Sequence, residues 1–329
     1  MYYFKIADFF ANIDFDIQLE KLIISNSLSD MQLKINDEII YADVRKEVRP
    51  QHISMFEFKT KKEKPFLVAA DYITPNAKKL LKGKGINYID GFGNASIKLD
   101  NLKVYVEQGN AKPIYNPYSE VFTQAGGQVL FQLLQHPKNI NLTQRKLAEI
   151  SRVSLGSVSK TIKGLFKEGF TVEWKSDKKF QLVKKEELLD KWVILVNEKI
   201  LPHYKIGRFS FGSKEKFVRK EEDTSHETIW GGESGAKMLT GYLNPEQFSL
   251  FTTRSKKYIM TNYRLVPNDS GEITVYQLFW QPGSSNFQCK NGSIIAHPLL
   301  IYAELMYSGN ERNIETAQII YNEYIKTNI

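Results

Sequence analysis

The sequence has a single cysteine, Cys289, so it holds neither an intrachain disulfide nor a zinc site built from several thiolates. Its five histidines are scattered, without the spacing of a metal site. No apolar run approaches the roughly 20 residues that cross a bilayer. Asp8, Asp14 and Asp16 interrupt the stretch where a signal peptide is continuously apolar. These absences predict a cytoplasmic protein that contacts no membrane and carries no cofactor.

What the chain does have is a concentrated positive charge. Residues 138–185 hold twelve Lys and Arg against four Asp and Glu, an excess of +8 that equals the net charge of the whole chain. The other 281 residues hold 33 charges of each sign and are neutral as a group. A basic segment in an otherwise neutral protein favours nucleic acid as the partner.

Two short helices joined by a turn are predicted inside this basic segment. Thr143 and Ser154 are residues that begin helices well, and apolar residues follow each of them at helical spacing. Phasing at 100° per residue assigns one face of the second helix to the core: Leu155, Val158, Ile162, Leu165 and Phe166. It assigns the opposite face to solvent: Gly156, Lys160, Lys163 and Lys167, flanked by Ser157 and Gly164. Small and basic residues on an outward face are typical of a DNA-recognition helix.

After Gly169 the run FTVEWKSDKKFQLVKK alternates, turns at Ser176 and Asp177, and alternates again, which predicts a hairpin wing. A winged helix-turn-helix is therefore expected, with Lys160, Lys163, Ser157 and Ser159 in or beside the major groove. The predicted DNA-binding residues are Arg145, Lys146, Arg152, Ser154, Gly156, Ser157, Ser159, Lys160, Lys163, Lys167, Lys175, Lys178 and Lys179. Two alternatives remain, a merely solvated lysine face and a winged helix that binds protein.

The N-terminal region predicts a mixed α/β domain. Residues 16–25 are expected to form a helix, and residues 31–35 and 38–48 a hairpin with a turn at 36–37. A charged loop is expected at 59–65. A buried strand, a helix begun by Thr74 and Pro75, and a further strand at 86–90 then suggest an α/β layer, and two more short strands follow.

Asp30 at the start of this hairpin and Asp43, Val44 and Arg45 on its second strand are spaced as in the PD-(D/E)xK endonuclease fold. There, two carboxylates bind a divalent metal and a lysine positions the attacking water. Arg45 takes the place of that lysine, and Lys46 points to the other face of the strand. Because arginine keeps its proton, the pattern predicts a domain that resembles a restriction endonuclease but has lost the chemistry.

The C-terminal region begins with a connecting helix at 186–204 and ends with two helices, 298–307 and 311–326. Between them, the segment WGGESG before an apolar helix admits two interpretations: an anion-binding turn for a nucleotide, or glycines that permit close packing. The Lys-Ser/Thr pair of a phosphate loop is missing, which favours packing. We expect Arg312 and Glu315 to be a surface ion pair or a packing clamp.

Several segments together resemble the AbiEi-type antitoxin regulators of bacterial type IV toxin-antitoxin systems. The most specific are GINYIDGFGNA, WGGESGA and the closing HPLLIYAELM with RNIETA. The resemblance implies a winged-helix repressor that binds its own promoter, beside a gene for a nucleotidyltransferase-like toxin that it counteracts without a stable complex. The departure is the additional domain that precedes the winged helix.

The sequence thus predicts an α+β, mixed α/β multidomain protein with an endonuclease-like α/β domain at 1–112, a winged helix at 118–185 and a C-terminal α/β domain at 186–329. The predicted function is sequence-specific binding of double-stranded DNA upstream of its own gene, without catalysis. Two alternatives stay open: a metal-dependent nuclease using Asp30, Asp43 and Arg45, and an adaptor whose C-terminal domain binds a protein.

Overall fold

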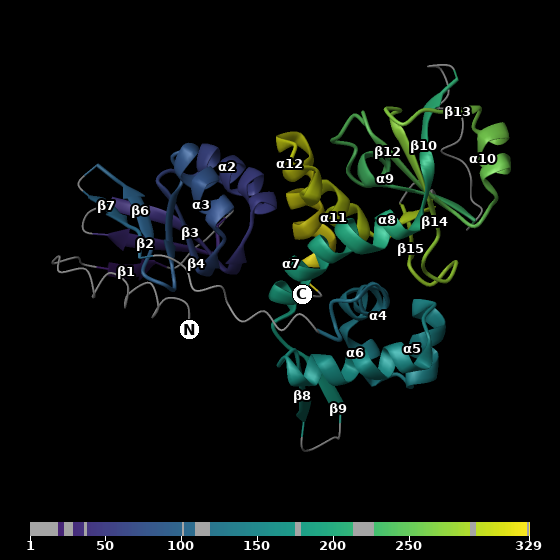
Figure 1. The fold of residues 1–329 in the computed structure, drawn as a ribbon, viewed down its shortest axis with the longest axis horizontal. Coiled ribbons are helices and arrows are strands. Elements are labelled where there is room, and N and C mark those ends of the chain that lie inside the picture. The colour runs from purple at the N-terminus through teal and green to yellow at the C-terminus, as the bar shows by residue number, and fades with distance from the viewer. Residues whose placement is uncertain are drawn as a thin grey trace. The chain divides into compact units, whose positions relative to one another are not determined.

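The computed structural model of the protein describes residues 19–22, 29–35, 38–100, 102–108, 119–174, 179–212, 227–289, 294–327 and 329. The chain divides into two compact units, residues 1–116 and 117–329 (Figure 1). Each unit combines helices with a seven-stranded sheet, which confirms the predicted mixed α/β class. The boundary predicted at 185/186 falls inside the second unit.

The first unit is built on one mixed sheet whose strand order follows the chain, from β1 to β7. β3 pairs in parallel with β4, and β4 with β5, while the other neighbours are antiparallel. The strands are β1 (Leu19–Leu22), β2 (Met31–Ile35), β3 (Glu38–Val48), β4 (Phe66–Ile73), β5 (Asn87–Asp90), β6 (Ala95–Lys98) and β7 (Lys103–Val106). The predicted hairpin is confirmed as β2 and β3, and its turn at 36–37 lies outside the described residues.

Two helices connect the parallel strands: α2 (Ile53–Lys62), which follows the short 3₁₀ turn η1 (Pro50–His52), and α3 (Pro75–Gly83). Thr74 caps α3 as expected, because its hydroxyl accepts a hydrogen bond from the Ala77 amide at 3.3 Å. Alternate residues of β4 enter two separate apolar clusters, one shared with α2 and α3 and one on the opposite face of the sheet. Burial of both faces explains why this strand is a continuous apolar run.

Two predictions for this unit are wrong. Leu19–Leu22 pairs as a strand with β2, not as part of the helix expected at 16–25, because edge pairing with β2 satisfies its backbone. Residues 59–62 belong to α2 instead of a charged loop, because one face of this lysine-rich helix carries Ile53 and Phe56 into the core.

The second unit begins with helices and a hairpin at the positions where the sequence predicts a winged helix-turn-helix. Its elements are α4 (Gln124–Gln135), the 3₁₀ turn η2 (Pro137–Asn141), α5 (Gln144–Ser151), α6 (Leu155–Lys167), β8 (Thr171–Trp174) and β9 (Lys179–Leu182). β8 and β9 form an antiparallel hairpin of their own. Figure 1 shows α5, α6 and this hairpin together on one side of the unit.

The rest of the second unit is a helix-covered mixed sheet in the order β13-β10-β14-β12-β11-β16-β15. Its strands are β10 (Lys205–Phe211), β11 (Thr228–Gly231), β12 (Phe248–Thr252), β13 (Leu265–Pro267), β14 (Ile273–Gln277), β15 (Asn286–Gln288) and β16 (Ile294–Ala296). Its helices are α7 (Lys185–Leu195), continued by the π-helical turn η3 (Val196–Ile200) and α8 (Leu201–Tyr204), then α9 (Gly232–Thr240), α10 (Lys256–Asn262), α11 (Pro298–Ser308) and α12 (Glu311–Ile320), which ends in the π-helical turn η4 (Tyr321–Ile325). The connecting helix and both closing helices are confirmed.

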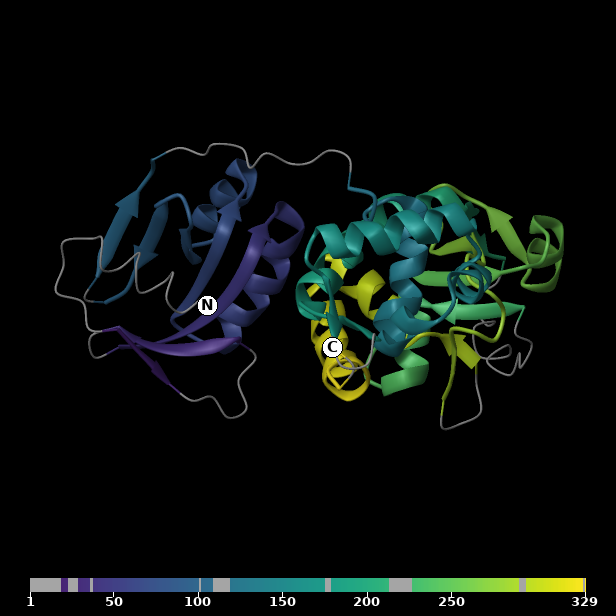
Figure 2. The same ribbon diagram turned by 90° about the horizontal axis from the view of Figure 1, so that it is seen from below.

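A single apolar core joins the winged helix to this sheet domain. Phe131 of α4 stacks on Trp192 of α7, with ring centroids 5.4 Å apart and planes 2° from parallel. The Trp192 indole also donates a hydrogen bond to the Gly127 carbonyl at 2.8 Å. Figure 2 shows the helices and strands of this unit, coloured teal to yellow, in a second view. Helix α4 therefore packs in the same apolar core as α7 and the sheet that follows it.

In the part of the chain that the structure describes, no helix combines the length and apolar character needed to cross a membrane.

Candidate nucleic-acid interface

The two helices of the motif begin where the sequence predicts. The Thr143 hydroxyl accepts a hydrogen bond from the Lys146 amide at 3.2 Å, and the Ser154 hydroxyl accepts one from the Ser157 amide at 3.1 Å. Between the helices, Arg152 adopts a left-handed backbone conformation with φ of 53°. This residue ends α5 and lets the chain turn sharply into α6.

The buried face of α6 differs from the predicted one. Val158 and Leu165 are buried as expected, but Thr161 and Gly164 share that face, and Leu155 and Phe166 are 47% and 37% exposed. The cause is the close approach of the chain before α4: a Cβ at Gly164 would lie 2.6 Å from Cγ2 of Val121. The helix turns its glycine side toward Val121, and this brings Leu155 and Phe166 toward solvent.

The lysines of α6 occupy the outward face as predicted. Lys160, Lys163 and Lys167 are exposed, and within the described residues none of their side chains makes an ion pair or a hydrogen bond. Lys146 on α5 differs, because its ammonium is 3.0 Å from the Glu149 carboxylate. Unpaired cations on one helix face are available for phosphate oxygens.

The polar residues of the first turn divide into two kinds. Ser154 and Ser157 are joined by their hydroxyls at 2.9 Å, so both are used in capping the helix. Ser159 is partly exposed, and its hydroxyl has no hydrogen-bond partner among the described residues. Gly156 is exposed, and a Cβ there would meet only the Ser154 hydroxyl, at 3.9 Å. This end of α6 is sterically open.

Two arginines expected at phosphates lie in different settings. Arg145 is exposed on α5 and has no partner among the described residues. Arg152 is exposed too, but its guanidinium donates a hydrogen bond to the Leu278 carbonyl at 3.0 Å. One edge of Arg152 therefore ties the turn of the motif to the segment after β14, a contact that the sequence did not predict.

The predicted wing is fixed against the motif by two contacts. The Asn141 side chain exchanges two hydrogen bonds of 2.8 Å with the backbone of Phe180, and the Phe180 ring packs edge-on against Phe166 of α6, with centroids 5.0 Å apart. Lys179 is exposed at the start of β9. Lys175 and Lys178 lie outside the described residues.

Buried glutamines of α4 also connect the motif to the C-terminal domain. The Gln128 amide donates to the carbonyls of Ser151 and Phe279, at 3.1 and 2.9 Å. The Gln132 amide donates to the Ile150 carbonyl and the Ser285 hydroxyl, at 3.3 and 2.9 Å. These bonds hold the end of α5, and hence the entry of α6, in one position relative to residues 278–285.

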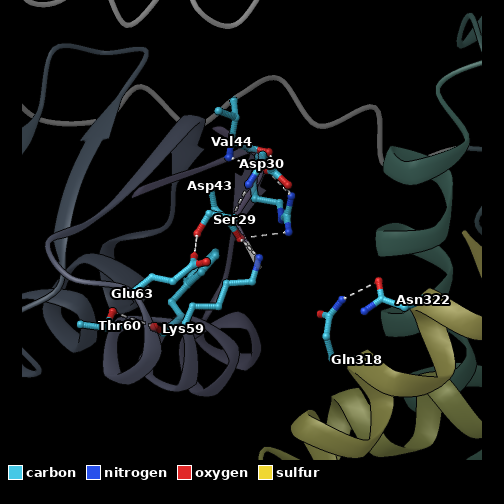
Figure 3. A network of polar contacts seen from close by, with 11 residues as sticks. Ser29, Asp30, Asp43, Val44, Lys59, Thr60, Glu63, Gln318 and Asn322 are labelled. Carbon is cyan, nitrogen blue, oxygen red and sulfur yellow. Dashed lines mark hydrogen bonds and ion pairs between the residues drawn. The ribbon is translucent and has the colours of Figure 1, made fainter. Parts of the chain in front are cut away.

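The first unit holds the acidic pair that suggested a nuclease. Asp43 is fully buried on β3, and its carboxylate lies 3.2 Å from the Arg45 guanidinium and 2.6 Å from the ammonium of Lys59 on α2 (Figure 3). Arg45 also contacts Asp30, at 2.9 Å, and the Asp30 amide donates to Asp43 at 3.2 Å. Lys59 was missed from the sequence, because its contact with Asp43 spans 16 residues.

This cluster fits a divalent cation poorly. The carboxylates of Asp30 and Asp43 are already paired with Arg45 and Lys59. Burial raises the pKa of Asp43, and the positive charges of Lys59 and Arg45 oppose that shift. The described residues contain no group of three or more acidic, histidine or cysteine side chains placed to hold a metal ion. Ser29, beside Asp30, donates a hydrogen bond to Glu63, the residue that directly follows α2.

The glycine-rich segment before α9 is a packing site. The Gly232 amide at the start of α9 donates to the Glu304 carboxyl group at 2.9 Å, so a side chain of the protein already occupies the place where an external anion would bind. Glu233 accepts hydrogen bonds from the amides of Glu246 and Gln247 and from the Asn313 side chain. The Arg312 guanidinium lies 3.2 Å from the Glu246 carboxylate, so Arg312 and Glu233 both hold the segment at Glu246, which agrees with the packing role expected for Arg312.

The C-terminal part of the chain matches the model of a known protein family. Residues 181–326, from the second wing strand through the last helix, match a family of transcriptional regulators described as AbiEi antitoxins of type IV toxin-antitoxin systems. The resemblance to AbiEi-type antitoxin regulators is thus confirmed over these residues.

Comparisons with individual proteins add little. No curated protein matches the chain. Among solved structures, the crystal structure of the Megavirus polyadenylate synthase matches with 8% identity and a TM-score of 0.27. The match covers 99% of this chain and 58% of that one. A TM-score this low does not show a common fold.

Proposed function

We propose that the protein is an autorepressor of antitoxin type that binds double-stranded DNA upstream of its own gene. The observation that carries the proposal is the outward face of α6, with three exposed lysines that have no partner among the described residues. α6 enters the major groove, Lys160, Lys163 and Ser159 reach base edges or phosphates, and Arg145, Lys146 and Arg152 contact the flanking backbone.

The wing extends the proposed interface. Lys179 stands at the start of β9, and the contacts of Phe180 with Asn141 and Phe166 fix this strand beside α6. With Lys175 and Lys178, it contacts phosphates of an adjacent groove. Repression is steric, because a protein bound at the operator excludes polymerase. From the family resemblance we carry over a functional link to a nucleotidyltransferase-like toxin encoded beside it.

The test is a gel shift with DNA from upstream of the gene, repeated at several salt concentrations. Lys160→Glu with Lys163→Glu is expected to weaken binding by about tenfold or more, and to lower the salt slope by about one for each lost phosphate contact. Lys79→Glu with Lys257→Glu is the matched control, since both lysines are exposed and lie on α3 and α10. Unchanged binding by the first variant would contradict the groove assignment.

A metal-dependent nuclease is the alternative. One observation favours it: Lys59 supplies, from α2, a lysine beside Asp43 that position 45 lacks. Arg45 argues against a nuclease, because its guanidinium already contacts the carboxylates of both Asp30 and Asp43, where the metal ion would bind. Incubation of the protein with plasmid and Mg²⁺ or Mn²⁺ separates the two functions. We expect no cleavage, and cleavage that Asp43→Ala abolishes would establish the nuclease.

A further inference from the structure

Leu155 is the first residue of α6, and its side chain is 47% exposed. Exposure of an apolar side chain forgoes part of the free energy that its burial would contribute. Capping does not explain the leucine either, since the Ser154 hydroxyl and the Ser157 amide make the cap. A polar residue would therefore be better suited to this position in a protein that met only water.

The surroundings of Leu155 are those of a groove-facing residue. Gly156 beside it carries no side chain and faces open space, apart from the Ser154 hydroxyl. The first turn of α6 contains no acidic residue, and the exposed Lys160 and Lys163 follow. The first turn of a recognition helix is the part that meets base edges in helix-turn-helix proteins. The basic residues of α6 complement the phosphates of DNA, and no acidic residue in its first turn would repel them.

The major groove offers one kind of apolar group, the C5 methyl of thymine. We propose that Leu155 is a specificity-determining residue that packs on a thymine methyl in the operator. This inference rests on the proposed DNA-binding function and refines it. The neighbouring lysines supply attraction that every sequence provides, while Leu155 distinguishes thymine from cytosine at one position.

The experiment replaces thymine by deoxyuridine, which keeps every hydrogen-bonding group and lacks only the methyl. Upstream DNA is prepared with either base, and the affinity of the full-length protein is measured for both. We expect the wild type to bind the uracil form about three to five times more weakly, because the methyl group that Leu155 contacts is missing. Leu155→Ala should bind thymine DNA more weakly than wild type, and its ratio of thymine to uracil affinities should fall by that same factor.

Leu142→Ala is the matched control, because Leu142 is 39% exposed and precedes α5 instead of lying on α6. It should keep the wild-type ratio. Single thymine-to-uracil replacements along the footprint then locate the base whose effect disappears in Leu155→Ala. If wild type binds both forms equally, or if Leu155→Ala keeps the full ratio, the inference is overturned while DNA binding stands. Absence of any upstream DNA binding by the wild type would overturn the proposed function itself.

Discussion

At the scale of single residues, the hydrogen bond by which His297 caps a helix depends on the protonation state of its imidazole ring. Its Nδ1 accepts a hydrogen bond from the Leu299 amide at 3.2 Å, at the start of α11. Burial, and to a smaller extent the neighbouring His136, lower the pKa of His297 to about 3. Only the neutral ring can accept this bond, so protonation would both charge a half-buried group and remove the cap.

We predict that this residue makes the second unit sensitive to acid. In the unfolded chain the histidine binds a proton below its ordinary pKa of about 6.5, whereas in the folded chain it stays neutral down to about 3. Stability is therefore complete above about pH 6.5 and is lost as the pH falls toward 3, by at most about 1.4 kcal/mol for each pH unit.

His297→Asn keeps an oxygen acceptor for the cap and removes the titration. Urea unfolding of both proteins at pH 7.5 and pH 5 measures the effect, and the variant should lose less stability between the two. The difference between proteins is the relevant quantity, because burial raises the pKa of Glu304 to about 7 and that shift favours the folded state as the pH falls. Equal losses in both proteins would contradict the prediction.

Residues that act on near neighbours in the chain could be predicted from the sequence, and residues that act at a distance could not. Thr74, Thr143 and Ser154 cap helices through amides three residues away, so composition and spacing were sufficient. Lys59 reaches Asp43 only because α2 folds back over β3, and nothing in the local pattern indicates that contact. The contact between Arg152 and the Leu278 carbonyl spans 126 residues and was missed for the same reason.

At the scale of elements, the phase of α6 depends on what packs against it. The period of the sequence correctly predicted an amphipathic helix, but several phases fit a helix with Leu155, Ile162 and Phe166 on one flank. Gly164 decides among them, because only a residue without a side chain can approach Val121 so closely. The sequence could have suggested this, since a glycine in the middle of a helix lowers helix stability and is best explained by packing.

Two glycine substitutions in α6 test this packing with opposite signs. Gly164→Ala places a methyl group 2.6 Å from Val121 Cγ2, and we expect it to destabilise the second unit by about 1–3 kcal/mol. Gly156→Ala meets only the Ser154 hydroxyl at 3.9 Å, and its better helix propensity should stabilise the helix by up to about 1 kcal/mol. Thermal unfolding followed by circular dichroism measures both. Destabilisation by Gly156→Ala equal to that by Gly164→Ala would show that the packing of Gly164 is not the cause.

At the scale of the whole molecule, the two units have separate apolar cores. The apolar clusters of the first unit contain no residue of the second. The charge excess lies in residues 138–185 of the second unit, and in the first unit Asp30 and Asp43 are paired with Arg45 and Lys59. Independent cores predict independent unfolding, so the full chain should not behave as one cooperative system.

This independence can be measured, because all four tryptophans belong to the second unit, at positions 174, 192, 230 and 280. Tryptophan fluorescence therefore follows only that unit, while far-ultraviolet circular dichroism follows both. We predict that Lys59→Met shifts one dichroism transition to lower guanidinium concentration and leaves the fluorescence transition in place. Removing the lysine leaves the Asp43 carboxylate buried with Arg45 as its remaining cation, which costs about 3 kcal/mol, near the lower end for a broken buried pair.

Lys84→Met is the matched control, because Lys84 pairs with Glu57 at the surface, where such a pair contributes about 0–1 kcal/mol. Its dichroism transitions should stay close to those of the wild type. A fluorescence transition that moves together with the dichroism in Lys59→Met would mean that the two units unfold as one. In that case the N-terminal unit would stabilise the second unit, and removal of the first unit would lower the guanidinium concentration at which the tryptophan fluorescence changes.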